Sequence, residues 1–172
     1  EVITELNACK DLIWRYNNIQ PTHLDERRQM LQQILGECDE LVFINQPFYC
    51  DYGKNIRVGK RFFANFHFTV LDEALVTIGD NAFIGPNVSI YTACHSTDPK
   101  ERNTRQEWAK PVTIGNNCWI GGSVTILPGV TIGDNCTIGA GSVVVNDIPA
   151  NCIAVGNPCK VVRVLGEFFE EG

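Results

Sequence analysis

The sequence predicts an all-β protein that folds as a parallel β-helix, and two observations carry this prediction. From Ile114 onward, an aliphatic residue opens six consecutive blocks of six residues, at positions 114, 120, 126, 132, 138 and 144. The fourth residue of most blocks is Asn, Asp or Gly, the types that tolerate a left-handed backbone conformation at a tight corner. An α-helix has no six-residue period, whereas short strands joined by corners, three to a coil, produce one.

The same period extends toward the N-terminus. Blocks open at positions 78, 84 and 90, and a looser set opens at 58, 64, 70 and 76 before a two-residue slip. Eighteen residues would return the chain to the same face, about 4.8 Å further along the axis. The expected corner residues are Asn81, Asn87, Asn117, Gly129, Asn135, Gly141 and Asp147, with Ala93 and Ser123 as exceptions. The fifth residue of each block is small or aliphatic, which explains Cys94, Cys118 and Cys136 as apolar packers.

Helices are expected ahead of the β-helix. Residues 4–17 and a second segment, with Thr22 as N-cap and Gly36 after its end, have the apolar stripe of amphipathic helices. Such helices would cover the open end of the β-helix, where strand edges are otherwise exposed. We therefore expect an N-terminal helical segment at 1–40, the β-helix at 41–160 and a C-terminal tail at 161–172.

The six-residue count lapses between Ile90 and Ile114. The intervening segment, YTACHSTDPKERNTRQEWAKPVT, contains two prolines and several charges, and it predicts a long protruding loop at about 92–111. Long excursions from a regular scaffold are where function concentrates. The interior of a small β-helix is filled by side chains, so a ligand site is expected outside it, beneath this loop or between neighbouring subunits.

Composition narrows the function classes. The net charge of −6 argues against a nucleic-acid binder held by phosphate neutralisation. No run of apolar residues is long enough for a membrane span, and the charged, helix-like start does not resemble a signal peptide. Eight cysteines without a Cys-x-x-Cys pair indicate reduced thiols in a cytoplasm and argue against a metal site.

Three histidines are candidates for acid–base chemistry. His23 is expected on the surface of the second helix. His67 lies in an early coil, where it would either line the same cleft as His95 or have a structural or surface role. His95 stands where the repeat gives way to the loop, and its position alone is equally compatible with function and with structure. A neutral imidazole there would take the proton of an alcohol that attacks a thioester.

The non-repetitive segments add a specific resemblance. CDYGKNIRVGKRFFANFHFTVLDE, IYTACHSTDP, KPVTIGNNCWIGGSVTILPGVTIGDN and VGNPCKVVR look like the maltose and galactoside O-acetyltransferases and the related nodulation acetyltransferases. The resemblance covers roughly residues 10–165. It implies a left-handed parallel β-helix, acetyl-CoA as donor and a hydroxyl of a sugar or related acceptor. It also implies a homotrimer with active sites between subunits and a catalytic histidine at the place of His95.

The resemblance also implies an acceptor site. The matching positions are Asp51, Phe63, Asn65, Asp72, Glu73, Phe83 and Glu107. Galactoside enzymes have an aspartate where this chain has Glu73, whereas maltose-type enzymes have one at the place of Asp72, so both carboxylates stay candidates. Glu107 is expected either to orient His95 or to be a solvated loop charge.

The resemblance implies a binding site for the acetyl-CoA donor as well. Its positions are Trp119, Gly121, Gly122, Ala140, Val145, Asn146, Lys160 and Arg163. Small residues along the coils would let pantetheine meet the backbone, and the two cations would contact the phosphates of CoA. Family members often have Thr-Lys in place of Val145–Asn146, and their far N-terminal acceptor contacts have no match here. The acceptor therefore stays open.

Three other functions compete with this interpretation. A xenobiotic (antibiotic) O-acetyltransferase would also place a histidine on a loop. A non-catalytic β-helix scaffold would tolerate replacement of His95. A carbonic-anhydrase-like β-helix needs three metal-binding histidines between subunits, and this region offers only His67 and His95. The sequence favours the sugar O-acetyltransferase.

Overall fold

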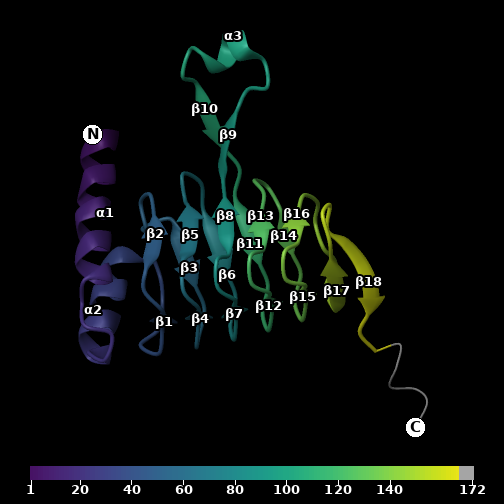
Figure 1. Cartoon of the computed structure of the whole chain (residues 1–172), viewed down its shortest axis with the longest axis horizontal. Helices are drawn as coiled ribbons and strands as arrows, with labels where there is room; N and C mark the ends of the chain where they lie inside the picture. The colour runs from purple at the N-terminus through teal and green to yellow at the C-terminus, as the bar shows by residue number, and fades with distance from the viewer. Residues whose placement is uncertain (167–172) are drawn as a thin grey trace.

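The protein is a stack of parallel coils with two helices at its N-terminal end (Figure 1). The computed structural model describes residues 1–166. Within that part, α1 (Val2–Asn17) packs against α2 (Leu24–Ile34) and against the first coil, and no helix is long and apolar enough to cross a membrane. The predicted parallel β-helix with short N-terminal helices is confirmed, while its left hand stays a prediction.

Three sheets form the sides of the coil. The four-stranded sheet contains β3 (Ile56–Val58), β6 (Val76–Ile78), β11 (Val112–Ile114) and β14 (Thr131–Ile132). The five-stranded sheet contains β2 (Phe48–Cys50), β5 (Phe68–Leu71), β8 (Ser89–Tyr91), β13 (Thr125–Ile126) and β16 (Val143–Val144). The seven-stranded sheet contains β1 (Phe43–Ile44), β4 (Phe63–Ala64), β7 (Phe83–Ile84), β12 (Trp119–Ile120), β15 (Thr137–Ile138), β17 (Cys152–Val155) and β18 (Lys160–Val164).

Strand pairing is parallel from coil to coil, and only the last strand of the seven-stranded sheet reverses. β18 runs antiparallel to β17 and ends the stack. It occupies the first residues of the segment expected as a C-terminal tail, and residues 167–172 of that segment lie outside the described part of the chain.

The strand register shows where the coils differ in length. At two of the three corners, inward residues are always six positions apart, as from Ile78 to Ile84 and from Ile84 to Ile90. At the corner that leads from the five-stranded to the four-stranded sheet, the spacing is eight from residue 50 to 58, eight from 70 to 78 and 24 from 90 to 114. We call this the expanded corner, formed by residues 51–55, 71–75 and 91–111. The uniform 18-residue coil expected from the repeat is wrong for the first three coils.

The two-residue slip falls within the expanded corner. Val76 pairs with Ile56, and Ile78 pairs with Val58, so Ile78 and not Val76 takes the place that opens a block. The extra residues of this coil are therefore in the turn that carries Glu73.

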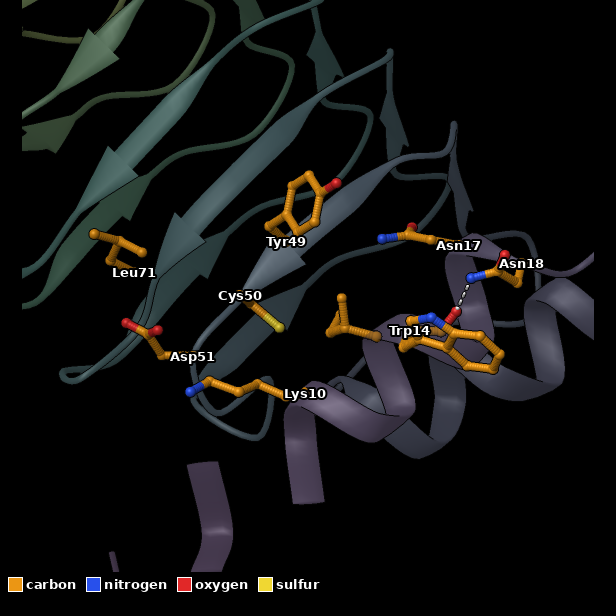
Figure 2. A pocket seen from close by; sticks show the side chains of 9 residues that line it. Lys10, Trp14, Asn17, Asn18, Tyr49, Cys50, Asp51 and Leu71 are labelled. Carbon is orange, nitrogen blue, oxygen red and sulfur yellow. Dashed lines mark hydrogen bonds between the residues drawn. The ribbon is translucent and has the colours of Figure 1, made fainter. Parts of the chain in front are cut away.

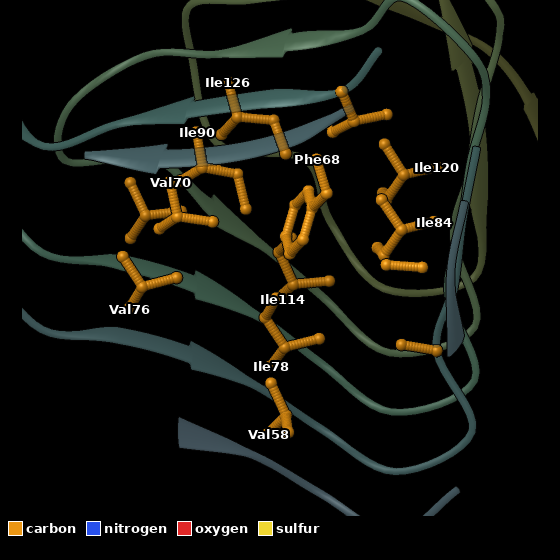
Figure 3. Packing of buried hydrophobic residues seen from close by; sticks show 14 of the residues in the cluster. Val58, Phe68, Val70, Val76, Ile78, Ile84, Ile90, Ile114, Ile120 and Ile126 are labelled. Atoms are coloured by element: carbon orange, nitrogen blue, oxygen red, sulfur yellow. The ribbon is translucent and has the colours of Figure 1, made fainter. Parts of the chain in front are cut away.

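Inward side chains stack in columns along the axis of the coil. Figure 3 shows Val58, Ile78 and Ile114 in one column, and Ile84 with Ile120 in another. All are almost completely buried, and each such side chain contributes about 1.5–3 kcal/mol relative to an exposed one. This packing fills the interior, so a substrate must bind outside the coil.

The corner residues largely follow the prediction. Asn81, Asn117 and Asn135 have positive φ, and their side-chain amides form a ladder with donor–acceptor distances of 3.1 Å and 3.2 Å. Ser123 also has a positive φ of 59°, although its residue type made it an exception. Asp147 does not, because it lies in a shortened turn where its carboxylate accepts the backbone N–H of Thr131.

Three local predictions need correction. His23 and not Thr22 is the N-cap of α2, and it makes no side-chain capping bond. Gly36 does not serve to end the helix. A glycine is required at this position because a Cβ would lie 2.1 Å from the carbonyl oxygen of Lys54. Cys118 and Cys136 are buried as expected, whereas Cys94 lies on the protruding segment and is only half-buried.

Candidate active site

The excursion from the third coil is a two-stranded hairpin that extends away from the stack (Figure 1). It consists of β9 (Ala93–His95) and β10 (Glu107–Ala109), with the short α3 (Pro99–Arg102) at its tip. The carboxylate of Asp98 accepts the N–H of Lys100 at 2.8 Å and begins α3. The antiparallel register sets His95 opposite Glu107.

His95 and Glu107 form the first pair of the candidate site. Nε2 of His95 lies 3.6 Å from Oε2 of Glu107, and both side chains are about half exposed, at 54% and 52%. The distance is longer than a hydrogen bond but short enough for an ion pair when the imidazole is protonated. Catalytic hydrogen bonds are often long before substrate binds. The structure therefore places Glu107 against the histidine.

Asp72 has a structural place in the expanded corner. Its side chain is completely buried, and Oδ1 accepts the backbone N–H groups of Asp51 at 3.0 Å and Tyr52 at 2.8 Å. Burial raises the pKa of the Asp72 carboxyl, and the two backbone N–H groups partly offset that increase. Asp72 thus holds the turn 51–55 in the preceding coil, and its side chain has no exposed atom to offer a ligand.

Glu73 is the accessible carboxylate of the same turn. It is half-buried, and Thr92 Oγ1 lies 3.5 Å from its Oε2 while donating to the carbonyl of Leu71 at 2.7 Å. Burial, a hydrogen bond with Asp51 and the charges of Asp51 and Glu107 raise the pKa of Glu73 to about 7. The Glu73 carboxyl is therefore partly protonated near neutral pH. Sequence reasoning missed Thr92, although it lies at the start of the segment in which the repeat lapses.

The aromatic residues of the acceptor set lie on another side of the coil. Phe63, Phe83 and Trp119 occupy one register position of the seven-stranded sheet and point outward. The rings of Phe63 and Phe83 are 6.1 Å apart, and Phe83 and Trp119 are exposed. Asn65 follows at the next corner, where its Oδ1 accepts the N–H of Phe66 at 2.8 Å.

The two groups of acceptor residues do not meet within one chain. Each coil visits the four-stranded, the seven-stranded and then the five-stranded sheet, and the expanded corner joins the last of these back to the first. The seven-stranded sheet is therefore the side opposite His95. His67 also lies away from His95, as the positive-φ residue of the corner that contains Asn65.

Part of the donor set lies beside the aromatic residues. Gly121 and Gly122 follow Trp119, and Ala140 occupies the same corner one coil further on. Gly121 is required by the coil itself, because a Cβ there would lie 2.6 Å from the backbone nitrogen of Ala140. A Cβ at Gly122 would have its nearest neighbour at 3.3 Å, in Pro86, so this glycine leaves more room along the surface.

The remaining donor residues lie elsewhere on the surface. Val145 and Asn146 are exposed in the last turn on the expanded-corner side, across the five-stranded sheet from Ala140. Lys160 and Arg163 are exposed on β18, at the C-terminal end of the seven-stranded sheet. One chain therefore does not bring all eight donor residues to one place.

Two further features bear on chemistry. A pocket of about 520 Å³ lies within the hairpin, lined by His95, Glu107, Arg102 and Arg105 among others, and sequence reasoning missed the two arginines. Within residues 1–166, no group of three His, Cys, Asp or Glu side chains is arranged to hold a metal ion.

Comparisons with known proteins identify the family. Family models match residues 1–39 (maltose acetyltransferase hexapeptide capping motif), 75–92 (hexapeptide repeat of succinyl-transferase) and 111–146 (bacterial transferase hexapeptide, six repeats). The galactoside O-acetyltransferase of Escherichia coli (strain K12) is 42% identical over 92% of this chain and 78% of its own length. The chain belongs to this family of hexapeptide-repeat O-acetyltransferases.

Solved structures agree with the assignment. The maltose O-acetyltransferase from Clostridium difficile 630 superposes with a TM-score of 0.95 at 47% identity, over 96% of this chain and 89% of that one. A galactoside acetyltransferase in complex with coenzyme A superposes with a TM-score of 0.93 at 40% identity, over 95% and 82% of the two chains. The resemblance stated from the sequence is confirmed, and this O-acetyltransferase is an enzyme rather than a silent scaffold.

Proposed function

We propose that the enzyme transfers an acetyl group from acetyl-CoA to a hydroxyl of a sugar or related acceptor, with His95 as general base. The observation that carries the proposal is the His95–Glu107 pair on the hairpin, near Glu73, whose pKa is raised to about 7. His95 takes the hydroxyl proton while the acceptor oxygen attacks the thioester carbonyl. The C–S bond then breaks, and the imidazolium returns the proton to the departing thiolate of CoA.

Glu107 and Glu73 have separate roles in this proposal. Glu107 faces the imidazole, so it orients the ring and stabilises the imidazolium that forms during transfer. Glu73 is the carboxylate that contacts the acceptor, because Asp72 is buried under two backbone N–H groups. A protonated Glu73 can donate to a sugar oxygen, whereas the ionised form can only accept.

We also propose a homotrimer whose active sites lie between subunits. Phe63, Asn65 and Phe83 would come from one subunit and His95 and Glu73 from its neighbour, since these groups lie on opposite sides of one coil. The exposed aromatic residues of the seven-stranded sheet then have a partner surface to cover them.

The donor would bind along the same subunit boundary. The relative crystallised with coenzyme A supports acetyl-CoA as donor. Trp119 would pack against pantetheine, Gly122 and Ala140 would admit it close to the backbone, and Val145–Asn146 would come from the neighbouring subunit. Lys160 and Arg163 would contact the phosphates. Replacing Lys160 by Ala should raise KM for acetyl-CoA several-fold and leave KM for the acceptor unchanged, in contrast to Lys60→Ala on a different part of the surface.

A cytoplasmic location is part of the proposal. All eight cysteines are free thiols, and Cys9 and Cys50 stay unlinked although their sulfurs lie 3.7 Å apart. This state fits a reducing compartment.

The test of the chemistry is release of CoA from acetyl-CoA with a panel of sugars, glycosides and antibiotic alcohols. Replacing His95 by Ala should lower kcat by about 10²–10⁴-fold, while the size of the assembly by light scattering stays the same. His23→Ala, exposed at the start of α2, is the matched control and should keep full activity. Full activity of His95→Ala would refute the mechanism, and activity on the antibiotics alone would reassign the acceptor.

The test of the subunit boundary is complementation. His95→Ala and Asn65→Ala are each expected to be nearly inactive. If the two side chains come from different subunits, a mixed trimer contains a boundary at which both are intact, so co-expression of the two variants should restore activity. Mixtures that stay as inactive as the separate variants would show that both residues act within one subunit.

A further inference from the structure

Two buried thiols meet where α1 lies on the first coil. Sγ of Cys9, on α1, is 3.7 Å from Sγ of Cys50, on β2, although the two residues are 41 positions apart in the chain. Both side chains are almost completely buried. Figure 2 shows the sulfur of Cys50 directed from β2 toward the helix. Neither thiol belongs to the acceptor or donor residues assigned above.

Buried thiols further along the coil bond to the backbone instead. Sγ of Cys118 lies 3.2 Å from a backbone carbonyl oxygen of the next coil, and Sγ of Cys136 lies 3.0 Å from another. Both thus donate a weak hydrogen bond while they fill the interior. In the described part of the chain, Cys9 and Cys50 are the only two cysteines whose thiols are hydrogen-bonded to each other.

The helix is held against the coil on both sides of Cys9. Toward the start of α1, Oε2 of Glu5 lies 2.8 Å from Nζ of Lys54. Toward its end, the Asn17 side chain donates to the carbonyl of Phe48 and accepts its N–H, both at 2.9 Å. A disulfide bond is about 2.0 Å long, so these contacts hold the two sulfurs within a small shift of bonding distance.

Two pockets give a small oxidant access to the pair. Cys50 lines a pocket of about 470 Å³ between α1 and the first coil, together with Trp14 and Tyr49 (Figure 2). Cys9 lines a second pocket, of about 230 Å³, which α1 forms with α2 and the turn 51–55. Hydrogen peroxide is little larger than water, so either pocket admits it.

The two thiols differ in acidity. The hydrogen bond with Cys50 lowers the pKa of Cys9, and this effect exceeds the opposite effects of burial and of the Asp72 and Asp51 charges. The same hydrogen bond, together with burial, raises the pKa of Cys50. Since the thiolate is the form that reacts with peroxide, we expect Cys9 to react first and Cys50 to react with the oxidised Cys9.

We propose that Cys9 and Cys50 form a reversible disulfide when the protein meets hydrogen peroxide. The sulfur of Cys9 attacks one peroxide oxygen, the O–O bond breaks, and the departing oxygen takes the thiol proton and leaves as water. This step gives a sulfenic acid on Cys9. The sulfur of Cys50 then attacks the Cys9 sulfur, the S–O bond breaks, and a second water leaves with the proton of Cys50. Two thiols are oxidised, and one peroxide is reduced to two waters.

The bond would fix the helical cap to the stack. The two helices lie at the N-terminal end of the β-helix (Figure 1), and the link joins positions that are 41 residues apart. A cross-link of that span restricts the unfolded chain, so the oxidised protein should resist unfolding better than the reduced protein. This inference does not depend on the acceptor or on acetyl transfer.

The first experiment maps the bond. The reduced protein is treated with a small excess of hydrogen peroxide, and its remaining thiols are alkylated under denaturing conditions. Mass spectrometry of the peptides without reductant should show a pair joined through Cys9 and Cys50, lighter by two hydrogen atoms than the separate peptides. Dithiothreitol should separate the pair. Its absence, or a dominant link between other cysteines or between subunits, would overturn the proposal.

Variants test the order of attack. In Cys50→Ala, the sulfenic acid of Cys9 lacks its partner and should be trapped by dimedone. In Cys9→Ala, the Cys50 thiol should stay reduced under the same treatment. Dimedone found on Cys50 instead of Cys9 would contradict the first step.

Thermal unfolding measures the consequence of the link. Oxidation should raise Tm of the wild type by about 5–10 °C, and dithiothreitol should reverse this rise. Neither Cys9→Ala nor Cys50→Ala should show it. Cys118→Ala removes a buried thiol that bonds to the backbone, so it is the matched control and should keep both the link and the rise. An equal rise in Cys9→Ala would refute the stabilising link.

Discussion

The corner that leads from the four-stranded to the seven-stranded sheet and the expanded corner belong to the same coils but have opposite characters. At the first, which we call the regular corner, Asn81, Asn117 and Asn135 repeat one conformation and join through side-chain amides. At the expanded corner the spacing of inward residues changes from eight to 24 and then to six. The regular corner holds the coils together, and the expanded corner holds Glu73, Glu107 and His95.

The difference between the two corners indicates that a regular coil can carry polar insertions at one corner without losing its strand pairing. Each coil pairs with its neighbours along all three sheets, so an insertion at one corner leaves the strands in register. Longer turns bring polar groups that need partners of their own, such as Asp72 under two backbone N–H groups. Burial of these groups then shifts the pKa of Glu73 toward neutrality.

The largest effect is expected when the inserted residues of the expanded corner are removed, so that this corner has the same spacing as the regular one. Deleting residues 94–111 leaves Ile90 and Ile114 six positions apart, the spacing that Ile126 and Ile132 have in the next coil. We expect a folded β-helix, because the inward columns on both sides are kept. Acetyl transfer should fall by at least the 10²–10⁴-fold that a general base contributes. Circular dichroism and the rate of CoA release measure the two effects, and a variant that unfolds would show that the hairpin stabilises the stack.

The second prediction perturbs the regular corner alone. In Gly115→Ala, the new Cβ would lie 2.3 Å from Oδ1 and 2.7 Å from the backbone nitrogen of Asp134 in the next coil. We expect the free energy of unfolding to fall by about 1–3 kcal/mol, as in other overpacked sites, with activity per folded molecule unchanged. Gly141→Asn is the control, because nothing lies within 4 Å of its Cβ position and Asn tolerates its φ of +75°. A loss of activity without a loss of stability would place chemistry at the regular corner as well.

The regular part of the molecule could be predicted from sequence because its rules are local. An aliphatic residue every six positions and an Asn at the corner each describe a single turn, so Ile114 and Asn117 were assigned correctly without knowledge of other coils. The position of His95 at the start of the excursion also follows from the sequence, because the repeat stops beside it.

The site could not be predicted to the same depth because its properties depend on groups one coil apart. The pKa of Glu73 depends on Asp51, 22 positions earlier, and the burial of Asp72 depends on the backbone of that same turn. Neighbouring positions in the first coils are 20 residues apart, so an 18-residue repeat does not align these residues with their partners. That Phe83 and His95 lie on opposite sides of the coil follows only once the three sheets are ordered.

The smallest expected effect tests the electrostatics of the expanded corner. The pKa of Glu73 is about 7 in the folded enzyme against 4.5 for an unperturbed glutamic acid, so unfolding releases a proton between these pH values. The free energy of unfolding of the wild type should therefore fall as pH rises from 4.5 to 7. Glu73→Gln removes this dependence, because an amide does not ionise. Since Glu73 is half-buried, the variant should gain on the order of 1 kcal/mol relative to the wild type across that window.

Denaturant unfolding at several pH values measures this difference, with the exposed Glu40→Gln as control. A parallel pH dependence in Glu73→Gln and the wild type would show that Glu73 is not the group that holds the proton. The expanded corner would then differ from the regular corner in shape but not in electrostatics, and the proposed role of Glu73 as hydrogen-bond donor to the acceptor would fail. If instead the free energy of unfolding loses its pH dependence in Glu73→Gln and not in Glu40→Gln, Glu73 in this lengthened turn is the group that holds a proton near neutral pH.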